Sequence, residues 1–286
     1  MPLHPRTKLN LALLAAVLAL AAIAVYRPGL ERPNLPPALT TLKPDAIHQI
    51  TLERRGAGRI VLVRDRNGHW ALRAPVAAPA SRFQVDAILR LASMRTLRQE
   101  ALEATDPVAL GLAKPEVTVT LDDTRIAFGS RAPLGNRRYV QVGDTVHLIP
   151  DITYYHLVGA YPTFVARRLL PQDARIASLA LPSVMLDRHE GHWRLEPPPK
   201  HYSADAPNRL AEAWHNARAI AVSAHAGAMN GEEVRIGLGN SPKPIRFLVL
   251  QRQPDLILGR PALGIVYRLP AEAAGTLLSL PQPLGD

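Results

Sequence analysis

The chain of 286 residues contains no cysteine. This absence excludes disulfide bonds, thiolate zinc sites, iron–sulfur clusters and a cysteine nucleophile. Aromatic residues are scarce at 5%, and because lysine is also rare, arginine supplies most of the formal net charge of +10. Hydrophobic residues make up 47% and charged residues 20%, so the chain is expected to fold, and it is long enough for two domains.

The positive charge is scattered along the sequence instead of forming a patch. A nucleic-acid binder usually clusters its basic residues and interleaves aromatic residues for stacking. No such stripe is present, so nucleic acid is not expected as a partner. The arginine doublets Arg137–Arg138 and Arg167–Arg168 are candidates for contact with an anionic partner, although solvated side chains are the default reading of such doublets.

Motifs of several enzyme classes are missing. The sequence has no phosphate-binding loop, no dinucleotide-binding glycine pattern after a strand and no G-x-S-x-G nucleophile elbow. The second half is rich in histidine, with His189-Glu190-Gly191-His192 as its densest part. This segment lacks the two-residue gap of a zinc-binding H-E-x-x-H helix and falls on an expected hairpin turn. We therefore predict no catalytic residue, no metal site and no cofactor.

An apolar run extends from Leu9 to Val25, interrupted only by Asn10. As a helix it would span about 26 Å, close to the roughly 30 Å of a bilayer core. Arg6 and Lys8 precede it, so the positive-inside rule predicts a cytoplasmic tail over residues 1–8. The alternatives are a buried core helix and a signal peptide cleaved near Ala22-Ile23-Ala24. The length of the run favours an uncleaved single-pass anchor over residues 9–26.

Residues 27–43 contain prolines at positions 28, 33, 36 and 37. Such a segment favours polyproline II, which at ~3.1 Å per residue extends on the order of 50 Å from Pro28 to Pro44. We predict a spacer that holds a periplasmic body away from the membrane.

Gly68-His69-Trp70 recurs as Gly191-His192-Trp193, each time after an apolar strand. Each tripeptide is expected to close a hairpin, with Asn67-Gly68 as the stronger type I′ turn signal. Gly68 and Gly191 should occupy the turns. Trp70 and Trp193 are predicted to be core anchors rather than ligand-stacking residues, because each can bury a large apolar area.

The similarity continues beyond the hairpins. Apolar residues recur at i, i+3, i+4 and i+7 over 85–92 and again over 207–214, which predicts a helix in each copy. Strands expected at 117–121 and 126–129 align with 247–250 and 256–259, and this alignment leaves the second copy shorter in its last hairpin, without a counterpart of residues 141–144. The predicted fold is α+β, with an N-terminal transmembrane helix and two tandem related units of antiparallel strands plus a helix, residues 44–171 and 172–286.

This layout resembles the family called domain of unknown function 4340. The resemblance rests on the N-terminal anchor, the G-x-W hairpins and a set of short motifs, namely Leu110-Gly111-Leu112-x-x-Pro115-x-Val117, Phe128-Gly129, Arg138-Tyr139-Val140 and Arg167-Arg168-Leu169-Leu170. It implies a bacterial envelope protein that accompanies ABC-type export or gliding-type transport components, and it implies no catalytic residues.

These patterns together predict a membrane-anchored periplasmic binding or scaffold protein. Its expected partners are the lipid of the inner membrane and a membrane protein such as an ABC-type transporter. Two other functions stay open: a metal-dependent or other hydrolase that acts on the cell envelope, and a binder of anionic glycan or lipid through the arginine surface.

Overall fold

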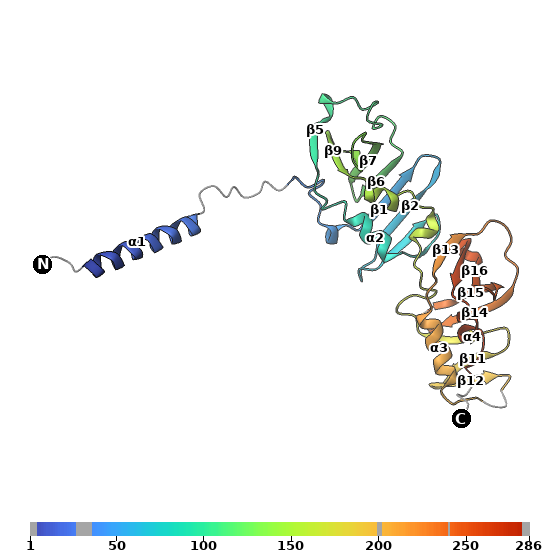
Figure 1. The fold of residues 1–286 in the computed structure, drawn as a ribbon. Coiled ribbons are helices and arrows are strands. Elements are labelled where there is room, and N and C mark those ends of the chain that lie inside the picture. The colour runs from blue at the N-terminus through green and yellow to red at the C-terminus, as the bar shows by residue number, and fades with distance from the viewer. Residues whose placement is uncertain (1–4, 27–35, 199–201, 240, 282–286) are drawn as a thin grey trace. The chain divides into compact units, whose positions relative to one another are not determined.

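The computed structural model describes residues 5–26, 36–198, 202–239 and 241–281 (Figure 1). The chain divides at Pro37 into an N-terminal part and one compact unit over residues 38–286. The N-terminal part contains the helix α1 (Pro5–Tyr26), whose described leucine and isoleucine side chains are exposed on all sides. Within the ranges given above, no helix is long and apolar enough to cross a bilayer. The helix expected over residues 9–26 is present as part of α1. Its role as a membrane anchor stays a prediction.

The expected spacer over residues 27–43 does not extend to residue 43 in the structure. Residues 27–35 lie outside the described ranges, and from Ala38 onward the chain packs on the compact unit. Leu39 is buried, its N–H donates to the Met94 carbonyl oxygen at 2.7 Å, and the Thr40 hydroxyl donates to the Ala92 oxygen at 2.7 Å. Residues 38–43 are thus held to the folded body.

The first half of the compact unit is built on one antiparallel sheet with the strand order β4-β3-β2-β1-β6-β7-β8-β9-β5. Its strands are β1 (Gln49–Arg54), β2 (Ala57–Arg64), β3 (Trp70–Ala74), β4 (Ala78–Pro79), β5 (Arg98–Ala101), β6 (Val117–Leu121), β7 (Thr124–Arg131), β8 (Arg137–Val142) and β9 (Thr145–Pro150). The helices of this half are α2 (Arg82–Leu89) and the 3-10 helices η1 (Pro44–Ala46), η2 (Leu102–Ala104), η3 (Asp151–His156) and η4 (Tyr161–Phe164).

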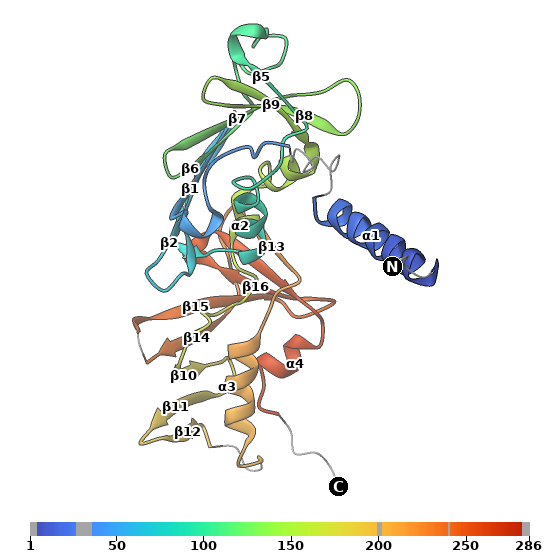
Figure 2. The same cartoon turned by 90° about the vertical axis from the view of Figure 1, so that its left-hand side faces the viewer.

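The second half holds another antiparallel sheet, in the order β12-β11-β10-β14-β15-β16-β17-β13. Its strands are β10 (Ile176–Ala180), β11 (Met185–His189), β12 (His192–Glu196), β13 (Ala221–Ala224), β14 (Glu232–Leu238), β15 (Ser241–Gln251), β16 (Leu256–Arg260) and β17 (Ile265–Leu269). The helices α3 (Ala206–Asn216) and α4 (Ala273–Leu277) pack against each other beside this sheet, and η5 (Pro261–Leu263) joins β16 to β17 (Figure 2). The α+β fold with antiparallel sheets is confirmed.

The two sheets repeat the same topology. If β4 is set aside, each strand of the first sheet has a counterpart at the same place in the second, from β3 and β12 at one end to β5 and β13 at the other. The register agrees as well. Phe128 lies opposite Val117 and Phe247 lies opposite Val234, on corresponding strands, and both phenylalanines are fully buried.

The sequence alignment of the two copies holds for the hairpins and is wrong further along the chain. Strand order makes β14 the counterpart of β6, whereas the alignment had matched 117–121 with 247–250, which lies in β15. The second copy is not shortened, because β16 and β17 correspond to β8 and β9. The error arose because Phe128-Gly129 and Leu258-Gly259 look alike although they lie on strands that are not equivalent.

The type I′ turn was predicted in the wrong hairpin. Glu190 and Gly191 both have positive φ, at 48° and 87°, as that turn requires. In the first hairpin only Gly68 has positive φ, at 82°. There the Asp65 carboxylate accepts the N–H groups of Asn67 and His69 at 2.9 and 2.8 Å, so a side chain organises the turn. Both glycines occupy turns, as expected.

The buried core runs continuously through both halves of the compact unit. Trp70 and Trp193, predicted as core anchors, are only half-buried and pack against its edge. Trp214 of α3 is the tryptophan inside the core, where it contacts Phe247 at 5.8 Å between ring centroids. The halves also meet at Tyr161, whose hydroxyl donates to the carbonyl oxygens of Leu263 and Gly264 at 3.0 Å.

Candidate functional site

A buried ion pair joins β8 to η3. The Arg138 Nε donates to Asp151 Oδ1 at 2.6 Å and its Nη1 donates to the Gly129 carbonyl oxygen at 2.6 Å. The two charged side chains are only 9% and 3% exposed, and the guanidinium carbon lies 3.5 Å from the centre of the Tyr154 ring. Arg131 Nε lies 3.7 Å from the second Asp151 oxygen. The two buried charges of Arg138 and Asp151 are therefore paired within the fold.

Tyr154 extends this cluster to the surface. Its hydroxyl donates to Glu116 Oε2 at 2.6 Å. Burial and this acidic neighbour raise the pKa of Tyr154 to about 12, so the phenol stays protonated at neutral pH. The cluster fixes η3 against the sheet.

Of the arginine doublets suggested for contact with an anionic partner, Arg137 and Arg167 are exposed and stay candidates. Neighbouring residues of a strand point to opposite faces, so β8 exposes Arg137 and buries Arg138. Arg138 must therefore be removed from the candidate contact residues. Arg167 is exposed, whereas Arg168 is half-buried and its Nη2 lies 3.4 Å from the His215 carbonyl oxygen.

The histidine-rich segment lies on a hairpin, as predicted. His189 and His192 face each other across β11 and β12, and both are exposed. His192 Nδ1 lies 3.2 Å from the Glu190 carbonyl oxygen, and His215 Nδ1 lies 3.1 Å from the Ala174 oxygen. His201 falls outside the described residues. Across the described parts of the chain, no three His, Cys, Asp or Glu side chains are grouped to hold a metal ion.

An exposed apolar face lies on α2 and η3, and it was missed in the sequence. A 3-10 helix has three residues per turn, so Ile152 and Tyr155 fall on one line of η3, and Val158 follows two residues after its end. Their exposed fractions are 66%, 65% and 43%. Phe83 of α2 is 67% exposed and packs edge-on against His156 at 5.5 Å. We call Phe83, Ile152, Tyr155 and Val158 the apolar face.

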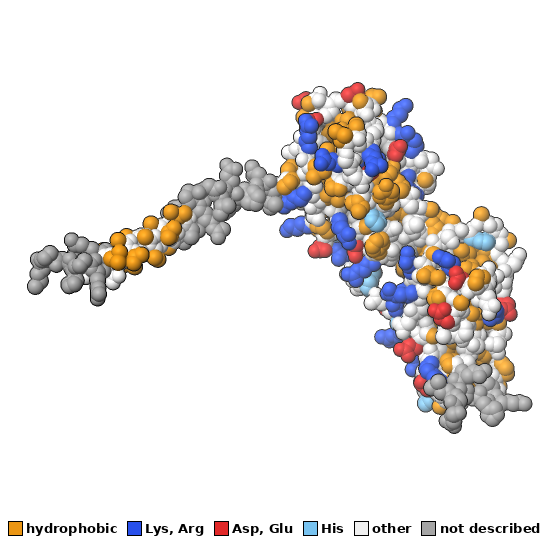
Figure 3. Space-filling view, viewed as in Figure 1, with side chains coloured by type: hydrophobic (Ala, Val, Ile, Leu, Met, Phe, Trp, Pro, Cys, Tyr) orange, Lys and Arg blue, Asp and Glu red, His pale blue; other side chains and the backbone are white. Residues whose placement is uncertain are grey.

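The opposite line of the same segment explains why the apolar face points outward. Asp151 and Leu157 are buried and Tyr154 is half-buried, so this line anchors the segment to the sheet. His156 Nδ1 contacts Gln84 Oε1 at 2.9 Å, which ties η3 to α2. Figure 3 shows hydrophobic side chains gathered in the region of α2, with basic side chains around them.

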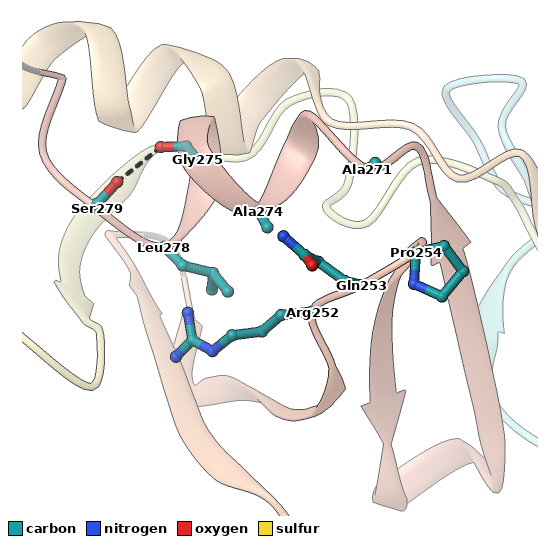
Figure 4. Close-up of a pocket in the computed structure, with 8 residues that line it drawn as sticks. All are labelled: Arg252, Gln253, Pro254, Ala271, Ala274, Gly275, Leu278 and Ser279. Atoms are coloured by element: carbon teal, nitrogen blue, oxygen red, sulfur yellow. Dashed lines mark hydrogen bonds between the residues drawn. The ribbon is translucent and has the colours of Figure 1, made fainter.

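A cavity of about 440 Å³ opens between α4 and the turn that joins β15 to β16 (Figure 4). Two of its polar side chains are engaged: Arg252 pairs with Glu232, and the Ser279 hydroxyl donates to the Gly275 oxygen at 2.7 Å. The side chain of Gln253 points toward α4. The other residues that line the cavity are small or apolar, so this cavity offers few polar groups to a ligand.

A second cavity, of about 250 Å³, lies at the edge of the first sheet between β5, β9 and residues 104–110. It is lined by Arg98, Gln99, Glu100, Ala104, Thr105, Asp106, Ala109, Leu110, Tyr139, Val146, His147 and Leu148. His147 is 5% exposed, and its Nδ1 is buried without a hydrogen-bond partner in the described part of the chain. Burial lowers the pKa of His147, so its ring is neutral at pH 7.

Comparison with protein-family models, with curated proteins and with solved structures finds no match to this chain. The resemblance to the domain of unknown function 4340 therefore stays a prediction from short motifs. The apolar face and the edge cavity are two features that the geometry offers for binding.

Proposed function

We propose that this protein is a membrane-anchored periplasmic scaffold that binds a membrane protein through the apolar face. The observation that carries the proposal is the exposure of four large apolar side chains on α2, on η3 and just after η3. Contiguous apolar patches on a folded surface mark interaction sites, and aromatic side chains dominate the binding energy of such sites. Phe83 and Tyr155 supply the aromatic anchors.

The membrane part of the proposal rests on α1. A helix that is apolar on all sides exposes hydrophobic surface to water, which is unfavourable, whereas the hydrocarbon core of a bilayer solvates it favourably. Arg6 and Lys8 before the apolar run favour a cytoplasmic N-terminus, with residues 38–286 in the periplasm of a bacterial cell. The anchor would hold the apolar face near other inner-membrane proteins.

Charge narrows the choice of partner. The net charge of +10 favours an acidic partner surface around the apolar contact. The resemblance of the sequence to the domain of unknown function 4340 suggests the class of partner, which is an ABC-type transporter or another envelope-assembly component. The protein would then act as an accessory subunit of that system, and it would need no catalytic group of its own.

The variant Tyr155→Glu tests this proposal. It places a charge in the centre of the apolar face, so the intact tagged chain extracted from native membranes should recover its membrane-protein partner at least 10-fold less well. That loss corresponds to the removal of one hot-spot residue, about 2 kcal/mol of binding energy. The readout is quantitative mass spectrometry of the co-purified proteins.

Val108→Glu is the matched control. Val108 is 75% exposed and lies outside the apolar face, so this variant should recover the partner at the wild-type level. Both substitutions are on the surface and should change the free energy of unfolding by less than about 0.5 kcal/mol. Equal recovery of the same membrane protein by wild type and Tyr155→Glu would refute the apolar face as the docking site.

A further inference from the structure

The segment that leads from the first half of the compact unit into the second places two arginines opposite each other. Arg168 bridges Arg218 in an antiparallel pairing, so the two side chains leave the backbone on the same face. Backbone hydrogen bonds flank this bridge: the N–H groups of Ala219 and Leu169 donate at 2.8 and 3.3 Å to carbonyl oxygens of the opposite segment. Arg168 and Arg218 are therefore a non-hydrogen-bonded pair, the kind in which facing side chains lie closest.

The charges of this arginine pair are not compensated by acidic side chains. Like charges directly opposite each other on antiparallel strands destabilise the pairing. Ion pairs in the second half involve other arginines, such as Arg246 with Glu233. Within the described residues, no carboxylate pairs with Arg168 or Arg218. A bound anion would remove the repulsion between the two guanidinium groups.

The corresponding place in the first half shows that the fold does not require an arginine pair. There Ala38 bridges Arg95, so an alanine occupies the position of Arg168. The correspondence follows from the next residue in each copy, Leu39 or Leu169, which is buried and donates its N–H across the pairing. The backbone pairing thus forms with alanine as well, and the arginine at position 168 needs another explanation.

Both guanidinium groups are accessible to a ligand. Arg168 Nη2 lies 3.4 Å from the His215 carbonyl oxygen near the C-terminus of α3, where a positive charge is favourable. Within the described residues Nη1 of Arg168 makes no hydrogen bond, and only Nε is both buried and unpartnered, so Nη1 is open to solvent. Arg218 is exposed, and its side chain makes no hydrogen bond in the same ranges.

Two guanidinium groups on one face favour a particular class of anion. Guanidinium groups bind carboxylates and phosphates through paired N–H···O bonds. One guanidinium can occupy both oxygens of a carboxylate, whereas a phosphomonoester offers three acceptor oxygens and a charge of about −1.5 to −2 at neutral pH. We propose that Arg168 and Arg218 bind the phosphate group of a phosphomonoester between them. This site shares no residue with the apolar face and does not depend on the scaffold function.

Phosphorus NMR of inorganic phosphate, titrated with the intact chain in a phosphate-free detergent, tests the proposal. An anion of this size should bind with a Kd on the order of 1 mM. Arg218→Gln and Arg168→Ala should each weaken binding about 10-fold, because each leaves a single guanidinium for the phosphate. Arg168→Ala should fold, since it gives the second half the residue that Ala38 supplies in the first.

Arg66→Gln is the matched control, because it removes the same charge from an exposed arginine in the turn between β2 and β3. Its affinity for phosphate should equal that of the wild type. Thermal unfolding checks that each variant is folded. The proposal is overturned if the wild type shows no saturable binding, if a folded Arg218→Gln variant keeps wild-type affinity, or if Arg66→Gln weakens binding to the same extent.

Competition then distinguishes the two sources of a phosphomonoester. Displacement of inorganic phosphate by glycerol phosphate would support a soluble ligand. Displacement by phosphatidic acid in mixed micelles, without displacement by glycerol phosphate, would support a lipid headgroup. Bound phosphate that neither compound displaces would overturn the assignment to a phosphomonoester.

Discussion

Replacement of Arg138 by alanine should lower the free energy of unfolding by about 3–5 kcal/mol, since it breaks a buried ion pair and leaves the other charge without its partner. Asp151 is 3% exposed and would keep only the more distant Arg131, whose Nε lies 3.7 Å away. The Gly129 carbonyl oxygen would also lose its donor. Urea unfolding of the intact chain in detergent, followed by tryptophan fluorescence, measures the change.

The neighbouring Arg137 provides the control. It lies on the same strand with an exposed side chain, so Arg137→Ala should change the free energy of unfolding by less than about 0.5 kcal/mol. Equal effects of the two substitutions, or a loss below about 1 kcal/mol for Arg138→Ala, would contradict the role of Arg138 as a buried structural charge.

Trp214→Ala is expected to cost about 3–5 kcal/mol of stability, as large-to-small changes of buried aromatic residues do. Trp214 is fully buried, packs on Phe247, and its Nε1 donates to the Leu277 carbonyl oxygen at 2.8 Å. The side chain thereby joins α3, α4 and the second sheet. Calorimetry or urea unfolding of the variant measures the loss.

Trp193→Ala is the comparison, because it removes the same kind of side chain from a half-buried position. Trp193 Nε1 donates to Asn208 Oδ1 at 2.9 Å on the exposed side of α3. Less apolar surface returns to water when this ring is removed, so the loss should be about half of that for Trp214 or smaller. A larger effect of Trp193→Ala than of Trp214→Ala would show that the recurring tryptophans are the core anchors after all.

The repeated architecture could be predicted in outline. The recurring glycine–tryptophan hairpins and the helices with apolar spacing were visible because both depend on local periodicity. The correct partner of each later strand was not visible, since β14 carries charged residues on its outer face and gave a weak apolar signal. The structure shows that β14 is the counterpart of β6, because β10 pairs with β14 as β1 pairs with β6, and the strands of each pair are distant in the sequence.

The candidate sites could likewise be predicted only where a local sequence pattern reveals them. The burial of Arg138 beside the exposed Arg137 follows from strand alternation and could have been inferred once β8 was assigned. The three-residue spacing of Ile152 and Tyr155 was also available, but it predicts a face only in a 3-10 helix. The cavity at His147 depends on where residues 104–110 cross the sheet edge, and no local pattern shows that.

We propose that α1 anchors the chain in a membrane with the compact unit on the periplasmic side. Because the chain has no cysteine, Val108→Cys introduces the single thiol, at a position that is 75% exposed. In cells whose outer membrane has been removed, a membrane-impermeant maleimide should label this thiol before lysis, and the labelled chain should stay with the membranes after alkaline carbonate washing. Release by carbonate, or labelling only after lysis, would contradict the account.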